Sequence, residues 1–155
     1  MEYKQPPPLT EEEIINFVQK MKIARFCSLN KDGSIHSVPV WYIFREGEFV
    51  IGTPSKSQKA RNIMRDNRVT LLIDNQEQQT KGVIIYGRAE ASLEGTQEAA
   101  LEIFKRHMDE EKARQYYNGL SKLGKFLKVA VKPYRYASFD YDKDTVYKRA
   151  THGEL

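Results

Sequence analysis

The chain has 155 residues, 40% hydrophobic and 30% charged, a composition that indicates one folded domain and excludes a disordered chain. Its one cysteine, Cys27, cannot form an internal disulfide or a cysteine metal cage, which predicts a reducing, cytoplasmic setting. The formal charge of +4 favours anionic partners without specifying nucleic acid, and no apolar run predicts a membrane span or a signal peptide.

The first third of the chain predicts a lead-in, one helix and a set of antiparallel strands. Residues 1–9 contain three consecutive prolines, and Thr10 with Glu13 then forms a capping box, so a helix is expected at 11–21. Asp-Gly and Glu-Gly turns separate the β-rich segments that follow and predict a meander. The three strands are expected at 23–29, 34–45 and 48–53.

The rest of the chain alternates in the same way. Ser55 and Gln58 have the spacing of a second capping box, which predicts a helix at 56–66. Further strands are expected at 69–73 and 82–93, a helix at 96–118, a strand pair at 126–141 and a polar tail at 142–155. Six mostly antiparallel strands with three edge helices predict a small barrel in a single domain, residues 1–155.

The stretch Thr53–Ile63, with the sequence TPSKSQKARNI, places hydroxyl groups and cations around the start of the helix expected at 56–66. Unpartnered backbone N–H groups and a partial positive charge make a helix N-terminus attractive to phosphate. Lysine is disfavoured there unless an anion is bound. The alternative is a capped helix with a solvated basic face. The candidate binding residues are Thr53, Ser55, Lys56, Ser57, Gln58, Lys59 and Arg61.

The segment HSVPVWYIF contains Pro39 inside a strand pattern, where it removes a donor from the ladder. Such a position lies at an edge, at a bulge or against a ligand, and the interrupted pairing leaves backbone groups near Pro39 free to hydrogen-bond a planar heterocycle. Trp41 is interpreted as a packing residue or as part of the same site.

Other catalytic and metal patterns are weak. His36, His107 and His152 lack the spacing of metal ligands, and His107 is expected on the apolar face of the 96–118 helix as a core histidine. Cys27 is interpreted as a small buried hydrophobe. Nucleophile-elbow, P-loop and dinucleotide-binding motifs are absent from the sequence.

Three segments, ARFCSLNKDGSIHSVPVWYIF, TPSKSQKARNIMRDNRVTLLI and KGVIIYGRAEASL, resemble in their order the pyridoxamine 5′-phosphate oxidase-like superfamily of flavin-binding split barrels. The resemblance covers residues 10–140. It implies a mainly β fold (α+β), a six-stranded antiparallel split β-barrel with peripheral helices, and a homodimer with FMN or a deazaflavin (coenzyme F-420) at its interface. By position, Thr53, Ser57 and Lys59 match the residues that hold the FMN phosphate, and Val38, Pro39 and Val40 match the strand that meets the isoalloxazine ring.

The chain departs from the true pyridoxamine phosphate oxidases at several positions. Those enzymes have Arg where this chain has Gln58 and His36, and Gln where it has Gly82. Their C-terminal substrate motif is not found either, so vitamin B6 oxidation is not expected. The segment from Lys59 to Asn62 and the RDNRVTLL that follows resemble the general flavin and deazaflavin oxidoreductase branches more closely.

These observations predict a cytoplasmic, homodimeric, FMN-binding oxidoreductase that passes hydride or electrons to a small-molecule acceptor, without nucleic-acid or membrane partners. The first alternative is a deazaflavin-dependent reductase, whose longer anionic tail would suit Lys56, Arg61 and Arg65. The second is a non-catalytic flavin-binding stress-associated protein. Nucleic-acid binding is the weakest alternative because no basic stripe with interleaved aromatic residues is evident.

Overall fold

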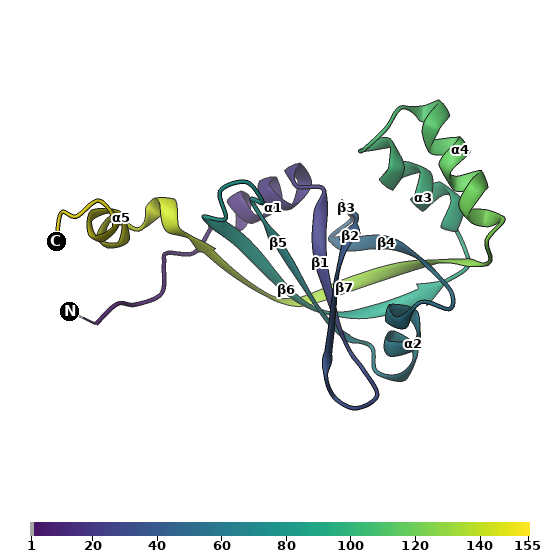
Figure 1. Ribbon diagram of the computed structural model, residues 1–155, viewed down its shortest axis with the longest axis horizontal. Helices are drawn as coiled ribbons and strands as arrows, with labels where there is room; N and C mark the ends of the chain where they lie inside the picture. Colours follow the sequence, from purple (N-terminus) through teal and green to yellow (C-terminus); the bar gives the residue numbers. More distant parts are fainter. Residues whose placement is uncertain (1) are drawn as a thin grey trace.

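The computed structural model describes residues 2–155, and this part of the chain forms one seven-stranded antiparallel sheet with five α-helices (Figure 1). The strands are β1 (Ile23–Leu29), β2 (Ile35–Trp41), β3 (Ile43–Arg45), β4 (Glu48–Pro54), β5 (Arg68–Asp74), β6 (Lys81–Ser92) and β7 (Phe126–Asp140). The helices are α1 (Glu11–Lys20), α2 (Gln58–Arg65), α3 (Thr96–Lys105), α4 (Glu110–Ser121) and α5 (Thr145–Thr151), with a short 3₁₀ turn at Tyr141–Lys143.

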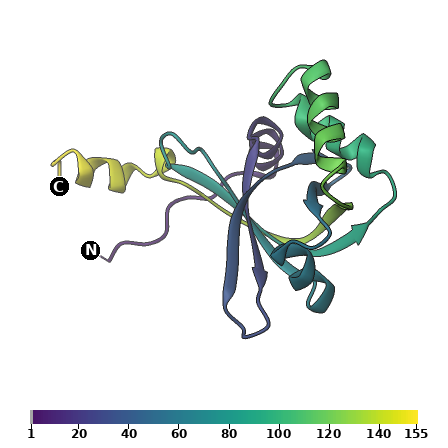
Figure 2. The ribbon, with the colours of Figure 1, turned by 45° about the vertical axis from the view of Figure 1, so that its right-hand side comes forward.

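The sheet curls into a split barrel because its two outer strands are neighbours in the chain. The strand order is β2-β1-β5-β6-β7-β4-β3, and only Tyr42 separates β2 from β3. β2 pairs with β1, whereas β3 pairs with β4 at the opposite edge. The curvature and the β1–β2 hairpin that projects below the barrel are visible in Figure 2. The predicted split-barrel fold is confirmed.

The break at Tyr42 corrects the predicted meander. Segment 34–45 is two strands rather than one, because Tyr42 turns into the barrel and donates from its hydroxyl to the Val18 carbonyl oxygen at 2.5 Å. Burial raises the pKa of this phenol. Conversely, segment 126–141 is one long strand instead of a pair, since β7 pairs with β4 through its first half and with β6 along most of its length.

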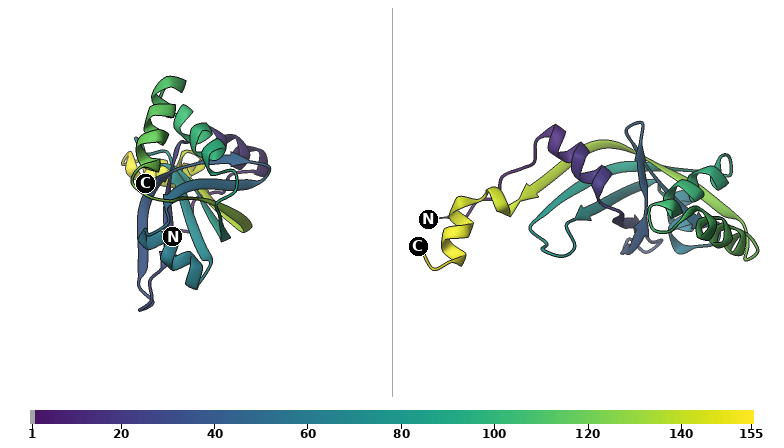
Figure 3. Two further views of the ribbon diagram at one scale, coloured as in Figure 1. Left: turned by 90° about the vertical axis from the view of Figure 1, so that its right-hand side faces the viewer. Right: turned by 90° about the horizontal axis from the view of Figure 1, so that it is seen from above.

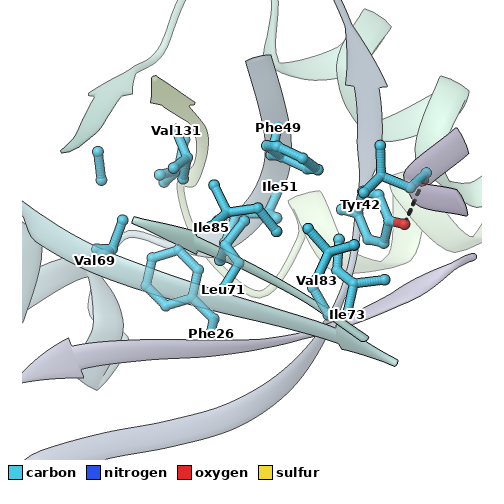
Figure 4. Close-up of a cluster of buried hydrophobic side chains, with 14 of the residues drawn as sticks. Phe26, Tyr42, Phe49, Ile51, Val69, Leu71, Ile73, Val83, Ile85 and Val131 are labelled. Carbon is cyan, nitrogen blue, oxygen red and sulfur yellow. Dashed lines mark hydrogen bonds between the residues drawn. The ribbon is translucent and has the colours of Figure 1, made fainter. Parts of the chain in front are cut away.

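The interior of the barrel is filled by aliphatic and aromatic side chains that alternate along the strands. Phe26, Phe49, Leu71 and Ile85 are completely buried, and they converge with neighbours from five strands in Figure 4. This alternation is the period-2 pattern that a half-buried antiparallel strand requires. α1, with the predicted Thr10–Glu13 capping box, packs against this core through Phe17 and Val18.

A helical hairpin forms a second layer beside β3 and β4. The predicted helix at 96–118 is in fact α3 and α4, because the side chain of Asp109 accepts a hydrogen bond from Lys112 N and starts a new helix. Ile43 and Val50 pack on Ala100, Ile103 and other residues of this hairpin. His107 therefore lies in the turn between two helices and not on a helix face.

The N-terminal segment and α5 extend together from one end of the barrel, at the opposite end of the long axis from the α3–α4 hairpin (Figures 1 and 3). Asp140 N donates to the Pro7 carbonyl oxygen at 2.8 Å, and the Tyr3 hydroxyl donates to Asp144 at 3.0 Å. Residues 2–9 of the predicted lead-in and the tail 142–155 therefore lie side by side, and the tail contains a helix. No helix within residues 2–155 is long and apolar enough to cross a membrane.

Candidate functional site

A cavity of about 310 Å³ lies where β2 and β4 meet α2 and the α3–α4 hairpin. Its wall is largely apolar and aromatic, and Lys59 is the one charged side chain in it. β2 supplies Pro39, Val40 and Trp41 to the wall. β4 supplies Gly52 and Pro54, and β7 supplies Phe126. The remaining lining residues, from the hairpin, are Ala100, Ile103, Phe104, Tyr116 and Leu120.

The start of α2 provides hydrogen-bond donors beside this cavity. Helix α2 begins at Gln58, and its N-cap is Ser57, whose hydroxyl accepts from Ala60 N at 3.2 Å. The predicted capping role of Ser55 is therefore wrong: its N–H donates to the Lys125 carbonyl oxygen at 2.9 Å. The first-turn N–H groups of Gln58 and Lys59 have no carbonyl partner within the helix, as in any helix start. They remain available to an anion.

Two of the predicted hydroxyl residues contact each other directly. The hydroxyl oxygens of Thr53 and Ser57 are 2.7 Å apart, joining the end of β4 to the start of α2. Thr53 is only 1% exposed. Its hydroxyl thus orients the Ser57 hydroxyl, which is the more accessible of the two.

Lys59 is a half-buried cation without an acidic neighbour. It makes no ion pair with any residue of the described chain 2–155, and burial lowers the pKa of its ammonium group. A cation held away from water without a counter-charge is unfavourable. A bound anion would supply the missing partner, and this is the strongest indication that the cavity receives a negatively charged group.

The structure thus brings together only some of the predicted site residues. Pro39, Val40, Trp41 and Lys59 line one cavity, with Thr53 and Ser57 beside it. The other five predicted residues, which include the exposed Lys56, are not in its wall. Val38 lies earlier on β2, Ser55 lies in the turn before α2, the Gln58 amide donates to Asn62 at 2.9 Å, and Arg61 reaches back to the Lys56 carbonyl oxygen at 2.9 Å.

Asn62, which the sequence analysis did not single out, fixes α2 against the barrel. It is completely buried, and its amide nitrogen donates to Ser28 Oγ and to Asn30 Oδ1, both at 3.0 Å. Its amide oxygen accepts from Gln58 and Arg65. The spacing of Ala60, Ile63 and Met64 in the sequence predicts an apolar stripe on this helix, but Met64 is 74% exposed. A polar side chain therefore occupies the inner position that the pattern assigned to apolar residues.

The hairpin side of the cavity was also missed. Tyr116 and Leu120 are one turn apart on α4, and the ring of Tyr116 meets Phe104 edge-on at 4.8 Å. The prediction of one straight helix at 96–118 does not place these residues together, whereas in the structure α4 folds back on α3. Phe126 crosses β4 where Gly52 lacks a side chain, since a Cβ there would lie 2.6 Å from Cε1 of Phe126.

Few side chains in the cavity wall could act as an acid or a base. Tyr116 and Lys59 are the titratable side chains in the cavity wall, and residues 2–155 contain no group of three or more His, Cys, Asp or Glu side chains suited to a metal ion. The geometry is suited to binding: an apolar slot for a flat ring, with hydroxyl, N–H and ammonium donors at one end. These donors fit a phosphate ester, and the aromatic walls fit a flavin or deazaflavin ring.

The sequence profile of the pyridoxamine 5′-phosphate oxidase family matches residues 10–134, and the chain belongs to this family. Among solved structures it is similar to the conserved hypothetical protein Rv2991 from Mycobacterium tuberculosis, with 28% identity and a TM-score of 0.74 over 93% of this chain and 94% of that one. It also shares its fold with an F420 reductase (16% identity, TM-score 0.63, covering 78% and 93% of the two chains). A FAD-binding protein from Mesorhizobium loti is 14% identical, with a TM-score of 0.59 over 85% and 95%. No curated protein matches the sequence.

Proposed function

We propose that this protein is an FMN-binding oxidoreductase. The observation that carries the proposal is Lys59, a partly buried cation without an anionic partner, in the wall of an aromatic cavity and beside the Thr53–Ser57 hydroxyl pair. The phosphate of FMN would contact Lys59, the Ser57 hydroxyl and the first N–H groups of α2. The flavin ring would lie against Pro39, Val40 and Trp41.

Bound FMN would supply the hydride or electron transfer, and the residues of this chain would supply binding and orientation. That division agrees with a cavity wall that lacks an acid–base pair. The Lys59 ammonium would neutralise the phosphate, and Thr53 would hold the Ser57 hydroxyl in place. Trp41, Phe104 and Tyr116 would exclude water from one side of the ring and leave a flat, apolar space for a small acceptor.

Pyridoxamine phosphate oxidation itself is not part of the proposal. Gly82, where the true oxidases have Gln, is fully enclosed, and a Cβ there would lie 2.7 Å from Cζ of Phe139. Gln58, where they have Arg, uses its amide to hold Asn62. Neither position therefore offers the side chain that the true oxidases have, and a different substrate is proposed for this chain.

A homodimer is proposed from the outer surface of the sheet. This surface is formed by β2, β1, β5 and β6, whose pairing registers align side chains in rows across the strands. The exposed Ile35 on β2 belongs to the same surface. An exposed sheet face normally carries polar residues, whereas five of the eight side chains in the two rows that follow are apolar or aromatic. One row is Pro39, Arg25, Leu72 and Ile84, and the next is Ser37, Cys27, Thr70 and Tyr86.

Thr70→Lys, at the centre of this face, is expected to weaken dimerisation at least about 100-fold, because an unpaired ammonium group would be buried between two copies. Sedimentation equilibrium at micromolar concentration measures the change. Gln97→Lys adds the same charge at an exposed position of α3 and is expected to leave the dimer intact. A monomeric wild-type protein, or a Thr70→Lys variant that dimerises as before, would contradict the use of this face.

Deazaflavin binding is the second candidate, favoured by cations around the α2 end of the cavity. The bond from Ser55 N to the Lys125 carbonyl oxygen brings the α4–β7 loop beside the start of α2. Lys56, Arg61 and Lys125 are exposed there, and none of them makes an ion pair within residues 2–155. A cofactor with a polyanionic tail would contact these cations. FMN ends at its single phosphate and would not contact them.

The deciding experiment is an absorbance spectrum of the purified protein, with mass spectrometry of the compound that heat releases. FMN is the expected mass, followed by reduction of the bound flavin by NADH or NADPH. A deazaflavin mass would transfer the proposal to the second candidate. Bound flavin that no reductant reduces would indicate a non-catalytic flavin-binding protein. A colourless protein that binds neither compound when added would refute cofactor binding.

A further inference from the structure

The ring of His107 lies flat against the ring of Trp41. The two ring centroids are 4.0 Å apart and the planes differ by 14°. The other aromatic neighbours of Trp41 are inclined to it: Phe104 meets it edge-on at 6.1 Å, and Tyr116 is tilted by 34° at 6.1 Å. Among these neighbours His107 alone covers a face of the indole ring. Trp41 is also the one tryptophan of the chain and part of the cavity wall.

His107 is held in this position without a hydrogen bond from its Nε2 atom. This nitrogen is buried and has no partner among the described residues, 2–155. An unsatisfied buried polar group is unfavourable and calls for an explanation in each case. A phenylalanine or leucine would avoid that cost at this position. The flat imidazole ring therefore contributes something other than hydrogen bonding, and the stack on Trp41 is the contact that it makes.

The charges around His107 favour its neutral form. Burial lowers the pKa of the imidazole, and Lys22 and Arg106 lower it further. Arg106 is fixed nearby by its bonds to the carbonyl oxygens of Tyr42, Gln19 and Met21. An imidazolium over indole would gain cation–π attraction, but a charged, unpaired Nε2–H would be buried beside two cations. The other charged groups around the neighbouring cavity of about 490 Å³ that His107 lines are Lys20, Asp74 and Glu77.

We propose that His107 is a positioning residue that backs the indole ring of Trp41 and thereby sets the plane of one wall of the cofactor cavity. The ring reaches Trp41 from the α3–α4 turn, so it also couples the position of the helical hairpin to the wall formed by β2. The effect on ligand binding rests on the proposed function, whereas the orientation of Trp41 does not.

The fluorescence of Trp41 tests the stack in the wild-type protein without any cofactor. An imidazolium in contact with indole quenches its emission more than a neutral imidazole does. Emission is therefore expected to fall on acidification with a midpoint below the ordinary histidine pKa of 6.5. His107→Phe keeps a flat ring that cannot titrate and retains His36 and His152, so its emission should not change over this range. A wild-type titration identical to that of His107→Phe would overturn the proposal.

A second pair of variants tests positioning. His107→Leu fills the space without an aromatic face, and His107→Phe restores the face. The loss of an aromatic pair worth about 0.5–1.5 kcal/mol should weaken FMN binding by up to about tenfold in His107→Leu, and His107→Phe should recover most of it. Acrylamide should also quench Trp41 more strongly in His107→Leu than in the other two proteins.

The outcomes separate this proposal from the proposed function. A folded His107→Leu protein with unchanged acrylamide quenching of Trp41 would overturn the positioning role. If His107→Leu does not fold, the wild-type and His107→Phe titrations still decide whether the rings are stacked. Failure of every variant and of the wild type to bind FMN would refute the cofactor, while the fluorescence data would still decide the position of Trp41.

Discussion

Replacing Lys59 with Ala is expected to weaken FMN binding by about 10- to 100-fold. A hydrogen bond between charged partners contributes about 1.5–3 kcal/mol, and each 1.4 kcal/mol is a factor of ten in affinity. The contribution of Lys59 should lie in this range because the side chain is half-buried and has no competing carboxylate in the described chain, 2–155. Quenching of flavin fluorescence, titrated with the apoprotein, measures the affinity.

Arg61→Ala is the matched control for this variant. Arg61 lies two residues further along α2, and Arg61→Ala also removes one positive charge. The Arg61 side chain is exposed, lies outside the cavity wall and donates to the Lys56 carbonyl oxygen. Its loss should change FMN affinity by no more than about threefold, the usual scale of a solvated surface charge. Equal effects of the two variants would show that only the general positive charge matters, and would contradict the specific role of Lys59.

Riboflavin separates the phosphate contact from the rest of the site. It has the same ring as FMN and no phosphate, so wild type should bind it more weakly than FMN. Lys59→Ala should reduce this preference, because the missing ammonium group affects only the phosphorylated ligand. A preference for FMN that is unchanged in Lys59→Ala would place the phosphate elsewhere, while leaving the ring-binding cavity as a separate hypothesis.

The elements of this fold that depend on short-range patterns were predictable from the sequence. The Thr10–Glu13 capping box and the strands at 23–29 and 69–73 were located to within a residue, because caps and period-2 alternation are local signals. Pro39 was interpreted as lying at an edge, at a bulge or against a ligand, and the structure supports the first of these alternatives, because β2 is the outermost strand of the sheet beside β1. The split-barrel class followed from the resemblance and was confirmed.

The errors occurred where tertiary contacts override local pattern. Segment 34–45 is β-rich throughout, and only the distant carbonyl of Val18, which accepts from Tyr42, shows why the strand breaks there. Likewise, Ser55 and Ser57 are both good helix caps, and the choice between them depends on the contact of Ser55 with Lys125. Contacts between residues far apart in the sequence do not appear in a local pattern.

The candidate site shows the same limit. The β4–α2 stretch was identified because a helix start with hydroxyls and cations has a recognisable chemistry. The α3–α4 wall was missed because Phe104 and Tyr116 look like ordinary helical core residues until the turn at Asp109 places them opposite β2. Asn62 was missed for the opposite reason: a polar residue on the inner side of a helix resembles a surface residue until its partners, Ser28 on β1 and Asn30 just after it, are known.

Asn62→Ala is expected to lower the free energy of unfolding by about 2–4 kcal/mol, because it creates a small cavity and leaves the buried hydroxyl of Ser28 without its partner. For a domain of this size the melting temperature should fall by roughly 5–15 °C, as measured by circular dichroism. Met64→Ala, at a position 74% exposed on the same helix, is the matched control and should change stability by less than about 0.5 kcal/mol. Asn62 anchors the helix that begins with Ser57 as its N-cap and Lys59 in its first turn. Asn62→Ala should therefore also weaken FMN binding, at temperatures where the variant remains folded. Equal melting temperatures for the two variants would show that the Asn62 bonds do not hold α2 against the barrel. The phosphate site would then depend on the Thr53–Ser57 contact alone.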